Sequence, residues 1–141
     1  MTDKLKVLFT GDRAWMNRDP IIKILKELPQ GTVIVHGACP TGADKIVDEE
    51  ARRLQPEKGF DIRAYPADWE GFEAKGNRNS AGPARNSEIL RKEHPDKSGL
   101  PIHKGYAFSG NLDRSRGTRD MTMKARAKGI AVKVISGGDP V

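Results

Sequence analysis

Short apolar runs alternate with apolar residues at helical spacing along most of the chain. Runs of strand length lie at 6–9, 32–35, 61–65, 105–108 and 130–135. Between them, apolar residues recur every three or four positions, which predicts helices at 20–28, 43–54, 84–92 and 118–128. Alternation of this kind is typical of a parallel sheet covered by helices. We therefore expect an α/β protein with a Rossmann-like, doubly wound, mainly parallel five-stranded sheet and helices on both faces.

Glycine and proline mark where several of these elements end. Pro56 and Gly59 close the second helix, and Gly129 follows the last helix as a C′ residue. The stretch 70–81 is polar and rich in turn-forming residues, and we interpret it as a mobile loop.

The 141 residues suit one domain that is large enough to bury a core. We expect the domain to span 1–136 and residues 137–141 to form a frayed tail. No apolar run approaches the roughly 18 residues of a membrane helix, and the first residues lack the layout of a signal peptide. Cys39 is the only cysteine, which favours a reducing compartment. These features predict a cytoplasmic protein with no membrane partner.

Positive charge is concentrated in the last third of the chain. The net charge of +6 lies entirely within residues 97–141, which hold 9 Lys/Arg against 3 Asp/Glu. Such an excess favours an anionic partner, either a phosphorylated small molecule or a nucleic acid. A solvated basic helix face would have the same composition, and both interpretations stay open.

The strand-to-helix loops carry the candidate chemistry. Right-handed crossovers place these loops at one edge of a parallel sheet, where ligands bind outside the carboxyl ends of the strands. After the first strand, Gly11 lets backbone amides approach a ligand, Arg13 is suited to a phosphate, and Trp15 is suited to stacking on a base. Core packing is the alternative role for Trp15.

The loop after the second strand opens directly into a helix. Gly37 and Gly42 flank its turn, and the free amides of a helix start form an anion site. Thr41 and Asp44 either contact the ligand or cap the helix, as N-cap and N3 residues. His36 is a candidate base or a hydrogen-bonded structural residue.

The third strand is followed by Asp68 and Trp69, an acid beside an aromatic ring. Gly82 then opens a helix whose first turn is expected to carry Arg85 and Asn86. A positive charge there is unfavourable with the helix dipole, so we interpret Arg85 as part of an anion site.

The loop after the fourth strand has the composition best suited to phosphate. Its candidate residues converge on another helix start: Arg116, Gly117, Thr118, Arg119 and Asp120. The segment is neither a Walker loop nor a dinucleotide fingerprint. No cluster of cysteines and histidines indicates a metal site, and we expect no required cofactor.

Five short motifs occur in order along the chain: Gly11-Asp12-Arg13-Ala14-Trp15; His36-Gly37 followed by Thr41-Gly42-Ala43-Asp44; Pro66-Ala67-Asp68-Trp69; Ala81-Gly82-Pro83-Ala84-Arg85-Asn86; and Gly117-Thr118-Arg119-Asp120-Met121. Together they resemble the YspA-like branch of the SLOG superfamily, whose small members are common in phages and bacteria. The resemblance implies a Rossmann-like fold with a nucleotide-related ligand at the strand carboxyl ends. Relatives include lonely-guy phosphoribohydrolases, ligand sensors in nucleotide signalling, and DprA-type proteins that bind single-stranded DNA.

The chain departs from the Pro-Gly-Gly-x-Gly-Thr-x-x-Glu pattern of the hydrolases. Residues 114–116 replace its Gly-Gly-x, and Met121 stands at the position of the Glu. Binding of a nucleotide or nucleotide-derived ligand, for sensing or sequestration, is therefore our leading hypothesis. An enzyme that cleaves nucleoside 5′-monophosphates, with Asp120 or Asp68 as its acid, is the first alternative. DprA-like, non-specific binding of single-stranded nucleic acid is the second. A homo-oligomer is left open.

Overall fold

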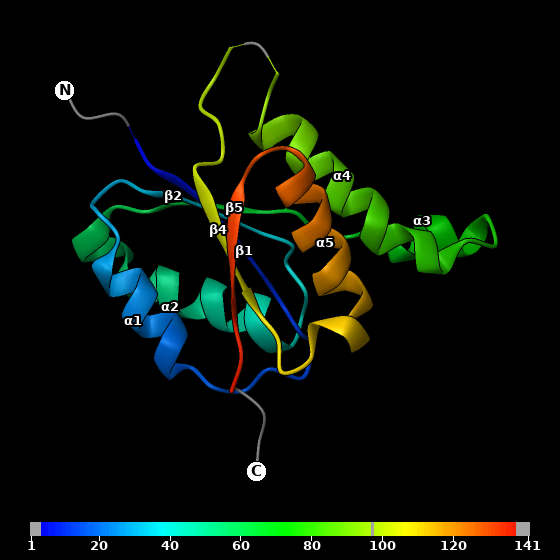
Figure 1. Cartoon of the computed structure of the whole chain (residues 1–141), viewed down its shortest axis with the longest axis horizontal. Coiled ribbons are helices and arrows are strands. Elements are labelled where there is room, and N and C mark those ends of the chain that lie inside the picture. Colours follow the sequence, from blue (N-terminus) through cyan, green and yellow to red (C-terminus); the bar gives the residue numbers. More distant parts are fainter. Residues whose placement is uncertain (1–3, 97, 138–141) are drawn as a thin grey trace.

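The structure, a computed structural model, describes residues 4–96 and 98–137 (Figure 1). Five parallel strands alternate with helices, as the hydrophobic pattern predicts. The elements, with 3-10 helices labelled η, are β1 Lys6–Gly11, α1 Asp19–Glu27, β2 Val33–His36, α2 Gly42–Lys58, β3 Asp61–Ala64, α3 Trp69–Ala74, η1 Arg78–Ser80, α4 Ala81–Glu93, β4 Lys104–Phe108, η2 Leu112–Arg114, α5 Arg116–Ala127 and β5 Ala131–Ile135. The predicted Rossmann-like α/β class is confirmed. Most of the expected frayed tail lies outside the described residues.

The order of the strands creates one place where a ligand crevice is expected. The sheet runs β3-β2-β1-β4-β5, so the chain builds outward from β1 in one direction and then returns to pair β4 with the other side of β1. In open parallel sheets, ligands bind at the carboxyl ends of the strands where the order reverses. Here that point lies beside Gly11, which pairs with Phe108.

Helices cover both faces of the sheet with separate apolar cores (Figure 1). Buried residues of α1 and α2, such as Ile21 and Val47, pack on one face. Buried residues of α4 and α5, such as Ile89 and Met121, pack on the other. Alternate strand residues point to opposite faces, which is why Phe9 joins the first core and Leu8 the second. None of the helices in the described part of the chain is long and apolar enough to cross a bilayer.

In the middle of the chain, two predicted element boundaries differ from the structure and one is confirmed. The second helix continues through Pro56 to Lys58, where a proline in the last turns removes little of the hydrogen bonding. The expected C-cap at Gly59 is confirmed by its left-handed conformation, φ 61°. The stretch 70–81 is not a loop, because it forms α3, η1 and the start of α4. Helix α3 has no buried residue, so it carries no apolar stripe for sequence reasoning to detect.

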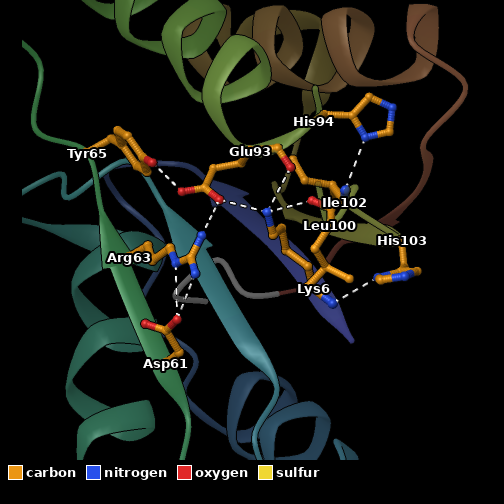
Figure 2. Close-up of polar contacts among 9 residues, drawn as sticks. All are labelled: Lys6, Asp61, Arg63, Tyr65, Glu93, His94, Leu100, Ile102 and His103. Atoms are coloured by element: carbon orange, nitrogen blue, oxygen red, sulfur yellow. Dashed lines mark hydrogen bonds and ion pairs between the residues drawn. The ribbon is translucent and has the colours of Figure 1, made fainter. Parts of the chain in front are cut away.

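A buried network of charges ties the amino end of β1 to the end of α4 (Figure 2). One oxygen of Glu93 accepts hydrogen bonds from the side chains of Lys6 and Arg63, each at 2.8 Å, and its other oxygen accepts from the Tyr65 hydroxyl. The Lys6 ammonium also donates to the carbonyl oxygens of Glu93 and Leu100, at 2.9 and 2.7 Å. Every charged atom at the centre of this network is therefore paired.

Two histidines fix the connection from α4 to β4 beside this network (Figure 2). The ring of His94 accepts the backbone N–H of Ile102 at 3.1 Å, and the ring of His103 accepts the backbone N–H of Lys6 at 2.9 Å. The end of the sheet opposite the expected crevice is thus closed by polar contacts within the chain.

Candidate functional site

A cleft of about 850 Å³ lies at the carboxyl ends of the strands. Residues of the loops after β1, β2 and β3 line it, together with the start of α4 and the segment from η2 into α5. This is the edge of the sheet that the topology indicates. Predicted site residues that line the cleft are Gly11, Arg13, Gly37, Asp44, Trp69, Gly82, Arg85, Arg116, Gly117 and Thr118.

Two of the predicted glycines allow the chain to pack closely where α2 begins, and of the two only Gly11 lines the cleft. Gly42 has φ +75°, and a Cβ atom there would collide with the backbone of Asp12 and Arg13. A Cβ atom on Gly11 would collide with the side chain of Ala43. The Ala43 N–H donates to the carbonyl oxygen of Asp12 at 3.1 Å. These glycines therefore seat the start of α2 against the β1 loop, which is a packing role rather than the close ligand approach expected at Gly11.

Asp12 joins three parts of the cleft, and sequence reasoning missed it. Its carboxylate accepts hydrogen bonds from the hydroxyls of Ser109 and Thr118, each at 2.9 Å, and from the Gly110 N–H at 3.3 Å. The aspartate thereby connects the β1 loop to the β4 loop and to α5. A polar residue directly after a strand, inside a recognised motif, was the available signal.

Asp44 and Arg85 both lie close to Gly37, in the loop that follows β2. One oxygen of Asp44, Oδ2, accepts the Cys39 N–H at 3.2 Å, whereas Oδ1 has no hydrogen-bond partner although the residue is only 6% exposed. Arg85 donates to the Gly37 carbonyl and, at 3.4 Å, to the Tyr65 carbonyl. A Cβ atom on Gly37 would lie 2.6 Å from the Arg85 guanidinium, so a larger residue at this position would displace that group.

Burial shifts the pKa values of these two groups in opposite directions. Burial raises the pKa of the Asp44 carboxyl and lowers the pKa of the Arg85 guanidinium. Both shifts disfavour the charged form, which is the usual consequence of holding a charge in a site that lacks a full set of partners.

Arginines dominate the charge of the cleft. The guanidinium groups of Arg13 and Arg78 lie 4.8 and 5.3 Å from the centroid of the Trp69 ring, and Gly82 leaves room beside that ring. The lining residues include two carboxylates, Asp12 and Asp44, and five arginines: Arg13, Arg78, Arg85, Arg114 and Arg116. The cleft is therefore electropositive. Its basic character draws on both halves of the chain and not only on residues 97–141.

Two predicted ligand contacts are buried in the fold instead. Trp15 is 2% exposed, packs edge-on against Phe108, and donates its indole N–H to the Asn17 carbonyl at 2.7 Å. The ring of His36 is also buried, and its two nitrogens contact Asp48 and the Ala38 N–H at 2.9 Å each. Both ring nitrogens of His36 are therefore engaged within the chain, as is the indole N–H of Trp15. The stacking role predicted for Trp15 is wrong.

The two predicted catalytic acids are engaged by other groups of the chain. Asp68 is the N-cap residue of α3 and accepts the Gly71 N–H at 3.0 Å. Asp120 accepts from the Asn86 amide at 3.0 Å and pairs with Lys124 at 3.0 Å. Because α5 begins at Arg116, two residues earlier than expected, Asp120 lies in its second turn, where it faces α4. Neither acid lines the cleft.

Three further predictions are corrected in the same way. Thr41 is the N-cap residue of α2 but its side chain makes no capping bond and does not line the cleft. Asn86 is buried between α4 and α5, and Arg119 lies on the exposed face of α5, so both lie outside the lining. Helix α4 begins at Ala81, which places Arg85 in the second turn, so the dipole argument made for it does not apply.

Four further lining residues outside the predicted set lie in η1 and in the segment before α5. Arg78 and Asn79 belong to the stretch interpreted as a mobile loop, and Arg114 and Ser115 precede the expected helix start. No periodic pattern in the sequence marks these residues. For Arg78 and Asn79, the position depends on how α3 and η1 fold back toward α4.

The comparisons with known proteins bear on the first half of the chain. The family model described as the YspA, cpYpsA-related SLOG family matches residues 5–72, which run from the start of the sheet into α3. Neither the curated proteins nor the solved structures contain a significant match. The matched range includes the cleft residues from Gly11 to Trp69, and the arginines from Arg78 onward lie after it. The resemblance seen in the motifs is confirmed over this range.

Proposed function

We propose that the protein, whose residues 5–72 match the model of the YspA, cpYpsA-related SLOG family, binds a phosphorylated nucleotide or nucleotide-derived ligand in the cleft, for sensing or sequestration. The observation that carries the proposal is the gathering of five arginines and one accessible tryptophan at the switch point of a parallel sheet.

The charges suit phosphate groups. A guanidinium group presents a planar set of donors that matches phosphate oxygens, often in pairs. Arg116 and Gly117 begin α5, and the first amides of a helix have no partner within the helix, which makes them available to an anion. A Cβ atom on Gly117 would meet no other atom within 4 Å, so the approach to this helix start is open.

Trp69 suits the base of the same ligand. Its ring lies beside Arg13 and Arg78, and nucleobases stack both on aromatic rings and on guanidinium planes. A ligand with phosphates at one end and a flat ring at the other fits this distribution.

A panel of nucleoside mono-, di- and cyclic phosphates in a thermal-shift assay tests the proposal. A ligand at 100 times its Kd stabilises a protein by about 2.7 kcal/mol, so at least one compound should raise Tm clearly. Arg116→Ala should weaken binding of that compound about tenfold, because a charge-assisted contact is lost. Arg119→Ala is the matched control, since it removes an exposed arginine from the same helix outside the cleft. No stabiliser in the panel, or equal losses in both variants, would contradict the proposal.

The geometry supports binding without cleavage of the glycosidic bond. Asp68 and Asp120 are engaged elsewhere, and Met121, at the position of the hydrolase Glu, is buried in the core between α5 and the sheet. Incubation with AMP and CMP, followed by chromatography for free base, should show no release above a protein-free control. Robust release that is lost in Asp120→Asn would instead establish the enzyme.

A further inference from the structure

We propose that Asp44 selects ligands by their sugar, accepting a hydrogen bond from a ribose hydroxyl through its open oxygen, Oδ1. The proposal deepens the nucleotide-binding function and rests on it. It assigns a specificity-determining residue and a ligand class, ribonucleotides in preference to deoxyribonucleotides.

The open oxygen is exceptional within this protein. Among the buried side-chain nitrogen and oxygen atoms of residues 4–96 and 98–137, Asp44 Oδ1 alone has no hydrogen-bond partner. Buried polar atoms are nearly always paired, and an exception in a cleft indicates a partner that arrives with a ligand. Asp44 lines the cleft although the residue is only 6% exposed, so a ligand that enters the cleft is the partner that can approach this buried oxygen.

Two neighbouring donors, the Cys39 N–H and the Arg85 guanidinium, already have acceptors. The Cys39 N–H is bonded to the other oxygen of Asp44 at 3.2 Å. Arg85 directs its guanidinium to the Gly37 and Tyr65 carbonyls and to the Asn86 side chain. Burial raises the pKa of Asp44, which means that the anion is held with incomplete stabilisation until another donor reaches it.

A hydroxyl group of the ligand is the donor best suited to Oδ1, because other groups of the cleft suit the phosphate and the base. The arginines attract phosphate, and a carboxylate beside them repels it, so phosphate does not suit Oδ1. Trp69 and its flanking arginines offer a surface for the base. The sugar joins base and phosphate, and its neutral hydroxyls donate to a carboxylate oxygen without adding charge.

The experiment compares sugars and variants by calorimetry. ADP, GDP, CDP and UDP are titrated into the wild-type protein, each beside its 2′-deoxy and 3′-deoxy forms. The form that lacks the bonded hydroxyl should bind about ten- to a hundredfold more weakly, because it leaves the buried oxygen unpaired. In Asp44→Asn this discrimination should fall to about threefold or less, because the amide retains an acceptor for Cys39 and places an N–H₂ donor at the Oδ1 position.

Asp113→Asn is the matched control, since Asp113 is exposed on η2 and does not line the cleft. It should leave discrimination unchanged. The wild-type titrations alone keep the proposal falsifiable should Asp44→Asn fold poorly.

Each outcome separates the two proposals. Binding of none of the four diphosphates would overturn nucleotide-diphosphate recognition together with this inference. Equal affinity for ribose and deoxyribose forms would overturn the inference alone. So would discrimination that persists in Asp44→Asn. A loss in Asp44→Asn that depends on the base but not on the sugar would assign Oδ1 to the base and overturn the sugar assignment.

Discussion

Two clusters of buried charge lie at opposite ends of this sheet, and they differ in how completely their carboxylate oxygens are hydrogen-bonded. Around Glu93, both carboxylate oxygens are bonded, and Lys6 has three acceptors (Figure 2). Around Asp44, one carboxylate oxygen is bonded and the other is open. The first cluster closes the fold at the amino end of β1, and the second forms part of the cleft at the carboxyl ends.

The pKa values of the Glu93 and Asp44 carboxyls are shifted in opposite directions, in keeping with this difference in hydrogen bonding. Burial acts to raise the pKa of Glu93, but hydrogen bonds from Lys6, Tyr65 and Arg63 outweigh it and lower the pKa below its ordinary range. Burial raises the pKa of Asp44, where the stabilising contacts are too few to reverse it. A buried charge with all its partners supports structure, whereas one without them is available for binding.

The largest effect is expected from breaking the completed cluster. Glu93→Gln leaves the buried Lys6 ammonium without a counter-charge and removes one of the two acidic partners of Arg63, so it should lower the free energy of unfolding by about 3 kcal/mol. Urea denaturation measures it. Glu88→Gln on the same helix removes only a half-exposed pair with Lys92 and should have a far smaller effect on stability. Equal losses in the two variants would show that the Glu93 cluster has no special role.

The open cluster should respond in the opposite direction. Asp44→Asn removes an incompletely paired buried charge, so the ligand-free protein should gain about 1 kcal/mol in stability. The same denaturation assay decides it. A loss as large as that of Glu93→Gln would mean that Asp44 is needed for folding, and the comparison would fail.

Lowering the pH should change the contributions of Glu93 and Asp44 to stability in opposite directions. The pKa of Glu93 is lowered in the folded protein, so its contribution is fully present above the ordinary value of 4.5 and is lost as the pH falls through the folded pKa. The stability gap between wild type and Glu93→Gln should therefore narrow in acid. The pKa of Asp44 is raised above 3.8, so its destabilising effect should fade as the pH falls through the folded pKa. Denaturation between pH 3 and pH 7 tests both, and parallel curves for the two variants would contradict the assignment.

The smallest effect is expected for nucleic acid. Basic residues outside the cleft, such as Arg126 and Lys133, are exposed and should support only weak binding of labelled oligo-dT. Each phosphate neutralised contributes a slope of about −0.7 in log K against log salt, so affinity should fall steeply toward physiological salt. Tight binding that persists there, and that Trp69→Ala abolishes, would favour the DprA-like alternative over the small-ligand cleft.

The sequence predicted the framework of the protein well because the framework follows from local patterns. Four of the strands are dense in apolar residues, as at Val33–His36, and their order along the chain implies the edge at which a ligand binds. The weaker third strand, Asp61–Ala64, was also placed correctly.

Side-chain roles at that edge were predicted less well because they depend on tertiary contacts. Trp15 is drawn into the core by Phe108, and His36 is engaged by Asp48 from the next helix. A shift of two residues at the start of α5 turned Asp120 toward Asn86. Arg78 reaches the cleft only because α3 and η1 are ordered, and an exposed helix leaves no apolar signal.

The hydrogen bonds of Asp12 join residues 5–72, which the family model matches, to the segment around β4 and α5, so both parts of the chain are needed to form the cleft. A fragment that ended at residue 72 would retain β1, β2 and β3 but would leave β1 as an unpaired edge, since β4 supplies its other neighbour. Its Asp12 would also lose the donors from Ser109, Gly110 and Thr118. Grafting this cleft into another scaffold would therefore require transferring both segments together, because the aspartate and its donors are 97 or more residues apart in the chain.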